Sequence, residues 1–141
     1  MTYRRNWKKR KTGKDKNYAT LDKWFSRFIR LRDTEEYGTG PCITCQKRFA
    51  FDKLDAGHYQ TRAKMATRFD ERNVHAQCIG CNRFNGGEKI AHGYQIAIKY
   101  GHSVKDEIDF KSRGVMKLLP YEKKELQDYY RKEARKLFAV S

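Results

Sequence analysis

The pattern of apolar and polar positions divides the chain into a polar start, helical flanks and a loop-rich centre. From Thr20 onward, apolar residues recur at three- and four-residue intervals, which predicts an amphipathic helix over residues 20–33 with Thr20 as its N-cap. The members of this apolar stripe are Leu21, Trp24, Phe25, Phe28 and Ile29. Residues 89–138 return to helical spacing, with Gly101 as a stop and Pro120 as a start.

The centre, residues 42–88, has short strand-like pieces and loops in place of a helical period. We therefore expect a single α+β domain over residues 20–141, with helices on either side of this centre. Only 38% of the 141 residues are apolar, which is a low share for a domain that must bury a core. Such a chain needs a source of stability besides apolar packing.

Charge sets the amino-terminal segment apart. The chain carries 32 Lys and Arg against 17 Asp and Glu, a formal net charge of +15, and nucleic acid is the polyanion that such a surface attracts. Residues 1–19 hold the densest run of cations and predict a flexible arm that follows a DNA backbone, although a solubilising tail has the same composition. The cations of this arm that we expect to bind DNA are Arg4, Arg5, Lys8, Lys9, Arg10 and Lys11.

Two absences bear on location. No apolar run reaches the length of about 18 residues that a membrane span requires, and no apolar stretch follows the charges of the first residues. We expect neither a membrane span nor a secretory signal, and therefore a cytoplasmic protein.

The four cysteines form two C-x-x-C pairs, Cys42 with Cys45 and Cys78 with Cys81, and none is left over. This spacing lets each turn aim two thiolates at one ion, which predicts a tetrahedral zinc site. Disulfides are the competing interpretation, but a cytoplasmic chain keeps its thiols reduced. Because four thiolates fill the coordination shell, we expect the zinc to be structural and to supply the additional stability.

Further motifs lie between and after these pairs: DAGHY, RFDERNVHAQC and CNRFN. Together with CITC and the stretch LDKWFSRFIRLRD, they resemble the NinG family, also called Rap, of lambdoid phage recombination endonucleases. The order of C-x-x-C, His, Asn, and C-x-x-C followed at once by Asn is similar to the zinc-bearing HNH, or ββα-metal, nucleases. The resemblance covers most of the chain and implies a ββα-metal motif clamped by zinc.

Carried over residue by residue, the resemblance places the general base at His58, the Asn that fixes this histidine at Asn73, and a metal ligand at Asn82. The chemistry asks for the same types, because histidine activates water near neutral pH and oxygen ligands suit Mg²⁺ or Mn²⁺. The chain departs from the common pattern at Gly57, where an Asp usually precedes the base. We assign that ligand to Asp55, which points to the same face of a strand as position 57. The other nearby acids, more often solvated charges, are Asp52, Asp70, Glu71 and Glu88.

Cationic side chains surround these residues, and we expect them to bind DNA phosphates. The alternative is that they are ordinary solvated charges. They include Arg62, Arg68, Arg72 and Arg83. His75 has two interpretations, contact with the scissile phosphate or packing.

The resemblance implies a structure-specific endonuclease that nicks Holliday junctions and D-loops by metal-dependent hydrolysis. Paired incisions in a two-fold junction favour a homodimer, with the apolar faces of residues 21–29 and 126–138 as possible contact surfaces. The alternative function is a non-catalytic, zinc-stabilised module that binds DNA or RNA. Both predict salt-sensitive binding, so turnover must separate them.

Overall fold

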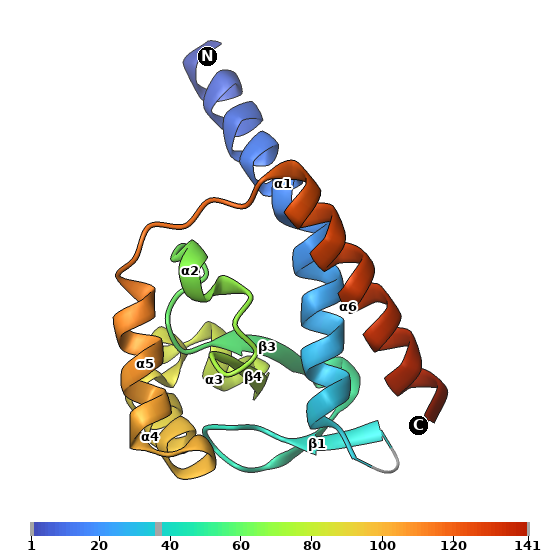
Figure 1. The fold of residues 1–141 in the computed structure, drawn as a ribbon, viewed down its shortest axis with the longest axis vertical. Helices are drawn as coiled ribbons and strands as arrows, with labels where there is room; N and C mark the ends of the chain where they lie inside the picture. The colour runs from blue at the N-terminus through green and yellow to red at the C-terminus, as the bar shows by residue number, and fades with distance from the viewer. Residues whose placement is uncertain (1, 36–37, 141) are drawn as a thin grey trace.

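A computed structural model describes residues 2–35 and 38–140, apart from the side chains of residues 2–17, 85, 139 and 140. It has a mixed α+β fold, as predicted. Figure 1 shows α1 and α6 side by side along one edge, with the short strands and the remaining helices beside them. The elements are α1 (Thr2–Asp33), β1 (Thr39–Pro41), β2 (Arg48–Ala50), η2 (Phe51–Lys53), β3 (Leu54–His58), α2 (Met65–Arg68), β4 (Val74–Cys78), α3 (Ile79–Arg83), η3 (Asn85–Glu88), α4 (Lys89–Tyr100), α5 (His102–Ser112) and α6 (Pro120–Val140).

The first helix is longer than the apolar pattern predicts. α1 runs through Thr20 without a break, so the prediction that Thr20 is its N-cap was wrong. Apolar periodicity could not reveal the earlier turns, because residues 8–16 contain no apolar residue to set a period. The basic side chains predicted to bind DNA between Arg4 and Lys11 lie outside the described side chains, and their role stays a prediction.

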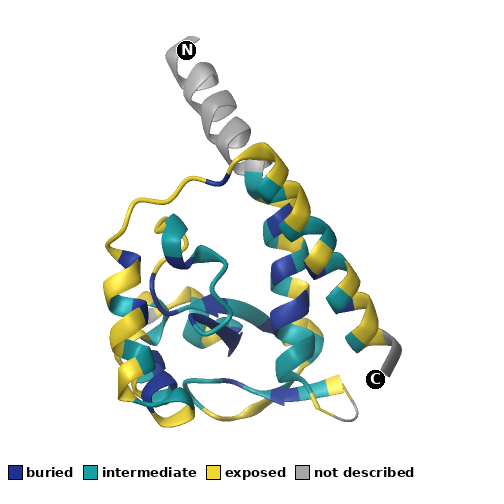
Figure 2. Ribbon diagram, viewed as in Figure 1, coloured by how far each residue is buried: buried dark blue, intermediate teal, exposed yellow. Residues whose placement is uncertain are grey.

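The main core lies between α1 and α6. Leu21, Phe25 and Ile29 of α1 are almost fully buried and pack with Tyr130 and Ala134 of α6. The rings of Phe25 and Tyr130 meet edge to face with centroids 4.9 Å apart. Figure 2 shows these buried positions along α1. The two faces proposed as dimer contacts therefore cover one another within the chain.

A second, smaller core lies under α4. Its members include Ile96 and Ile108, both fully buried. The apolar residues that mark α4 in the sequence lie largely on its outer side instead, where Ile90 is 91% exposed and Ile98 is 61% exposed. The inner side of α4 contains His92, which is fully buried against β4.

Each short strand pairs with one antiparallel neighbour. β1 pairs with β2, and β3 pairs with β4 in a register that joins Asp55 to Gln77 and His58 to Val74. The end of α1 holds β4 in place, because Arg32 donates to the Val74 carbonyl at 2.8 Å and Asp33 accepts from the Ala76 N–H at 2.8 Å. This attachment sets β3 and β4 against α1.

Within the described part of the chain, no helix is long and apolar enough to cross a membrane.

Candidate functional site

The four cysteines come together at one point, as their spacing predicts. Their Sγ atoms all lie within 4.8 Å of one another, and Cys45 and Cys78 are 3.9 Å apart. Cys42 directly follows β1, whereas Cys78 ends β4 and Cys81 lies in α3. The cluster is therefore placed to hold a metal ion that joins the β1–β2 ribbon to the β4–α3 unit.

Backbone hydrogen bonds shape the first turn of this cluster. The Gln46 N–H donates to the Cys42 carbonyl at 2.9 Å, and Gln46 has the left-handed φ of 62° that such a tight turn requires. The Ile43 N–H donates to the Ala76 carbonyl at 2.9 Å, which ties the turn to β4. Burial raises the pKa of the Cys78 thiol to about 12, so ionised sulfur here needs a bound cation.

A cleft of about 530 Å³ contains the predicted base and both predicted metal ligands, together with two of the predicted DNA-binding arginines. His58 and Asp55 reach it from β3, and Asn82 reaches it from α3. The opposite wall comes from α1 through Asp22 and Ser26. The structure thus brings together the predicted base and both predicted metal ligands.

The ring of His58 has a defined tautomer. Its Nε2 lies 2.9 Å from the Arg68 carbonyl oxygen. Because a carbonyl only accepts, Nε2 carries the hydrogen and Nδ1 keeps its lone pair. Burial lowers the pKa of His58, which keeps the ring neutral at pH 7. A neutral ring with a free lone pair is the state that a general base requires.

Asp22 holds the Arg68 segment against α1, a contact that the sequence reasoning missed. Arg68 Nε donates to Asp22 Oδ1 at 3.1 Å, and Nη2 donates to Oδ2. The Arg68 guanidinium also lies over the Tyr18 ring, 5.0 Å from its centroid. Its side chain is only 13% exposed, so the structure gives Arg68 an internal partner in place of the predicted DNA phosphate. One of the few acids on a strongly basic helix was the signal available.

Asp55 and Asn82 are direct neighbours. Asn82 Nδ2 donates to Asp55 Oδ2 at 3.0 Å, and Arg83 makes two further bonds to the same carboxylate, at 3.0 and 3.1 Å. The amide nitrogen and oxygen are nearly equal in size, so turning the Asn82 amide over presents Oδ1 beside Asp55. A dication would replace the positive hydrogens that now face the carboxylate. The donor set therefore fits a hard, oxygen-preferring ion.

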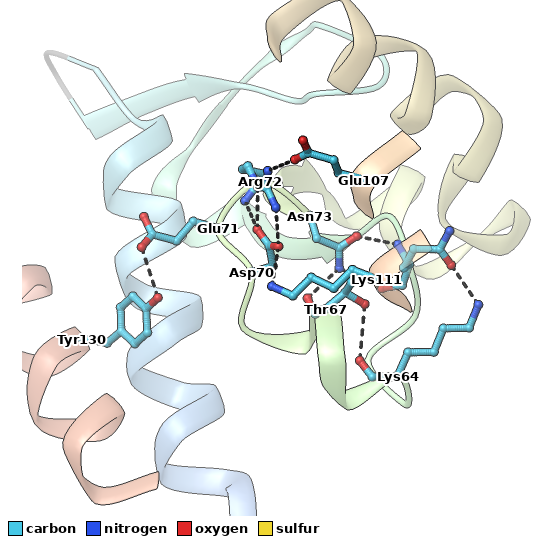
Figure 3. Close-up of polar contacts among 10 residues, drawn as sticks. Lys64, Thr67, Asp70, Glu71, Arg72, Asn73, Glu107, Lys111 and Tyr130 are labelled. Carbon is cyan, nitrogen blue, oxygen red and sulfur yellow. Dashed lines mark hydrogen bonds and ion pairs between the residues drawn. The ribbon is translucent and has the colours of Figure 1, made fainter. Parts of the chain in front are cut away.

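The side chain of Asn73 binds backbone groups of the loop that follows His58. The side chain is fully buried, and its Oδ1 accepts from the Gln60 N–H at 2.8 Å. Its Nδ2 donates to the carbonyls of Gln60 and Thr67, each at 3.0 Å. Figure 3 shows this amide pointing into the loop. Asn73 therefore fixes the segment that follows His58. None of its hydrogen bonds in the described structure reaches the imidazole, so any hold of Asn73 on the histidine acts through this backbone.

The remaining predicted arginines fall into two groups. Arg62 and Arg83 line the cleft, with side chains 58% and 59% exposed. Arg72 is instead held by Asp70 at 3.0 Å and Glu107 at 2.8 Å, as Figure 3 shows. Burial alone would raise the pKa of Asp70, but hydrogen bonds from Arg72 and Lys111 lower it to about 2. Asp70 is thus an ion-pair centre that joins the loop to α5.

His75 is 1% exposed and therefore packs inside the protein. Its Nδ1 lies 3.0 Å from His92 Nε2, and its Nε2 lies 3.1 Å from the Tyr100 hydroxyl. Of the two interpretations that the sequence left open, the structure supports packing.

The chain resembles known phage proteins. It matches the family described as "Bacteriophage Lambda NinG protein" over residues 2–139. Protein ninG of Escherichia phage 933W is 39% identical over 83 residues, which cover 58% of this chain and 39% of that protein. Protein ninG of Salmonella phage P22 is 39% identical over 83 residues, covering 58% and 38%. For Protein ninG of Escherichia phage lambda, the identity is 37% over 83 residues, covering 58% and 38%.

The matched segment therefore spans well under half of each relative's length. No solved structure matches this chain.

Proposed function

The chain belongs to the NinG family of bacteriophage proteins, and we propose that it is a metal-dependent endodeoxyribonuclease that nicks branched recombination intermediates such as Holliday junctions and D-loops. The observation that carries this proposal is the single cleft shared by His58, Asp55 and Asn82. Phosphodiester hydrolysis needs a base that deprotonates water and positive charge at the phosphate. His58 would supply the base, and Asp55 and Asn82 can hold a metal ion that supplies the charge. The succession of β3, β4 and α3 supports an HNH-type ββα motif.

His58 acts on the attacking water in this proposal. Its Nδ1 takes a proton from water, and the hydroxide formed attacks phosphorus in line with the 3′ oxygen. The bond between phosphorus and the 3′ oxygen breaks, which leaves a 5′ phosphate and a 3′ hydroxyl whose proton comes from solvent. The Arg68 carbonyl accepts from Nε2–H at 2.9 Å, so it fixes the tautomer before the reaction and stabilises the imidazolium after it. Asn73 acts as a positioning residue, because it fixes the backbone between Gln60 and Thr67.

Asp55 and Asn82 would hold Mg²⁺ or Mn²⁺, which when bound supplies stabilisation of charge on the scissile phosphate and the departing oxygen. Arg83 is more than half exposed, so its side chain is able to leave Asp55 and bind a phosphate instead. Arg62 is placed for the same task on the α1 side of the cleft.

Zn²⁺ is the proposed occupant of the four-cysteine cluster. Four sulfur donors suit tetrahedral zinc and leave no open position for water, so the ion has a structural role. Asn82 directly follows Cys81, so the same ion fixes the start of the segment that carries the catalytic ligand. Zinc thus positions the second metal site without taking part in the reaction.

Turnover separates this proposal from a non-catalytic, zinc-stabilised DNA- or RNA-binding module. We would incubate the purified protein with an end-labelled Holliday junction, a D-loop and plain duplex, with Mg²⁺ or with a chelator. The proposal predicts nicking of the branched substrates that requires Mg²⁺. Absence of metal-dependent nicking on every substrate would leave the binding module as the better explanation.

Matched histidine variants test the base. His58→Ala should abolish nicking and retain binding, whereas His102→Ala, which removes an exposed histidine at the start of α5, should nick normally. Retained nicking in His58→Ala would place the base elsewhere. Sedimentation of the protein with and without junction tests the proposed homodimer, which a purely monomeric active species would contradict.

A further inference from the structure

A second pocket lies between α1 and α6, away from the cleft. It has a volume of about 280 Å³ and shares no lining residue with the cleft. We call it the Trp24 pocket, and its lining residues are Trp24, Arg27, Ala134, Arg135 and Phe138. It therefore combines a large aromatic surface with cationic side chains from two helices.

The positive charge at the Trp24 pocket has no neutralising acid among the described side chains. Lys23 Nζ lies 5.6 Å from the Trp24 ring centroid, and the guanidinium carbons of Arg27 and Arg135 lie 5.9 and 5.8 Å from it. None of these cations forms an ion pair with any acid in the described part of the chain. Three like charges around one ring repel each other, so an anion bound between them would be favoured.

The Trp24 side chain is partly buried. Trp24 packs by one side against the core cluster that contains Leu21 and Phe28, while another part of the ring lines the pocket. An indole that already packs on the core loses little conformational entropy on binding. The long side chains of Arg27 and Arg135 now lie over its face, and their movement to neighbouring phosphates would free that face to stack on a nucleobase. Unpaired bases offer such a face, whereas bases inside a duplex keep theirs covered.

The position of the pocket suits a branched substrate. Asp22 and Ser26 point from α1 into the cleft, while Trp24 and Arg27 line the pocket. At about 100° of rotation per residue, Trp24 lies about 200° around the helix from Asp22. The pocket and the cleft are therefore on opposite sides of α1, separated by about 10 Å of helix.

We propose that the Trp24 pocket binds an unpaired base of single-stranded DNA, with Arg27 and Arg135 on the neighbouring phosphates. The choice of DNA rests on the proposed function, and the inference adds a strand-binding site across α1 from the reaction. A second copy of the chain is a poorer occupant, because a two-fold contact here would oppose two sets of unneutralised cations.

Tryptophan fluorescence tests the stacking directly. The chain has two tryptophans, so a Trp7→Phe background leaves Trp24 as the sole indole. Titration with a short oligothymidylate in zinc-containing buffer without added Mg²⁺ or Mn²⁺, where no cleavage is expected, should quench this fluorescence. A duplex of equal length should quench it far less at the same bound fraction, because its bases are already stacked.

Charge variants test the phosphate contacts. Arg27→Gln/Arg135→Gln should weaken oligothymidylate binding about tenfold and lower the slope of log K against log salt by about 0.7 for each lost phosphate contact. Lys124→Gln/Lys132→Gln removes the same charge from exposed positions of α6 outside the pocket, and it should change affinity by much less. Both pairs replace exposed side chains, so folding should be retained, which circular dichroism checks.

Three results would overturn this proposal: no quenching with oligothymidylate, equal quenching by duplex, or equal weakening by the two charge pairs. Failure of the nuclease proposal gives a different signature. Quenching without nicking of any substrate would reject the nuclease proposal and support the Trp24 pocket as a DNA-binding site. Nicking without quenching would support the nuclease proposal and reject the pocket.

Discussion

The buried pair His75 and His92 should make the protein lose stability in mild acid. Both rings are essentially inaccessible to water, and they share a hydrogen bond of 3.0 Å. Burial lowers the pKa of His75 to about 2 and that of His92 to about 4. The nearby cations Arg32 and Lys99 also disfavour a proton on His75. The folded protein therefore keeps both rings neutral well below the pH at which free histidine is protonated.

The size of the effect follows from these pKa values. The unfolded chain binds a proton at each histidine below its ordinary pKa of 6.5, whereas the folded chain does not until the pH falls to about 4 for His92 and about 2 for His75. The contribution of the two neutral rings to the free energy of unfolding is thus fully present above the ordinary pKa of histidine, and it is lost progressively as the pH falls below that pKa. Each ring contributes a slope of about 1.4 kcal/mol per pH unit, so the pair costs about 4 kcal/mol at about pH 5.

Urea unfolding with saturating zinc, at a series of pH values between about 5 and 7.5, measures this slope. Acid also releases zinc from thiolates, so the wild type alone is not decisive. His92→Leu supplies the comparison, because it removes one of the two rings and leaves the cysteines in place. Its slope should be smaller by about 1.4 kcal/mol per pH unit. Equal slopes in the two proteins would show that His92 is protonated in the fold, and the reasoning would fail.

Three further predictions concern the site. Nicking by the wild type should rise with pH through the lowered pKa of His58 and be constant by pH 7; a rate that still climbs steeply above pH 7 would point to another base. Asn73→Ala should lower the free energy of unfolding by about 3 kcal/mol in urea titrations, because it strands buried backbone groups of Gln60 and Thr67; a cost under about 0.5 kcal/mol would contradict this. Cys78→Ser should release the metal and lower the melting temperature, measured with a metal indicator and by calorimetry, and an unchanged melting curve would argue against a structural ion.

Local spacing predicted the convergence of the cysteines, which lie close together in sequence within each pair. The C-x-x-C pairs converge on one point, because each pair needs only one turn to aim its thiols. Asp55 and His58 both line the cleft from β3. Alternation along a strand would place residues three apart on opposite faces, so the resemblance predicted their meeting and the spacing did not. The convergence of Asn82 with Asp55 depended on the family resemblance, because 27 residues separate them.

Pairings between distant elements could not be predicted in this way. The ion pair of Asp22 and Arg68 spans 46 residues, and either side chain alone has the signature of a solvated charge. The apolar spacing also does not reveal the inner side of α4, because the helix buries the polar His92 and exposes Ile90. Apolar spacing shows which residues share a face of a helix. In α4, the hydrogen bond between His92 and His75 is what turns the His92 face inward.

The first helix is as much a part of the proposed site as the strands that carry His58. A two-stranded pair such as β3–β4 is at best marginally stable alone, and here α1 supports it through Arg32 and Asp33. Asp22 on the same helix holds the Arg68 segment whose carbonyl orients the His58 ring. A fragment limited to residues 42–88 would keep every cysteine and every predicted ligand, yet it would lose the cleft wall from α1 and Asp22, which anchors the Arg68 segment. Such a fragment should therefore bind metal but fail to hold His58 in its reactive tautomer.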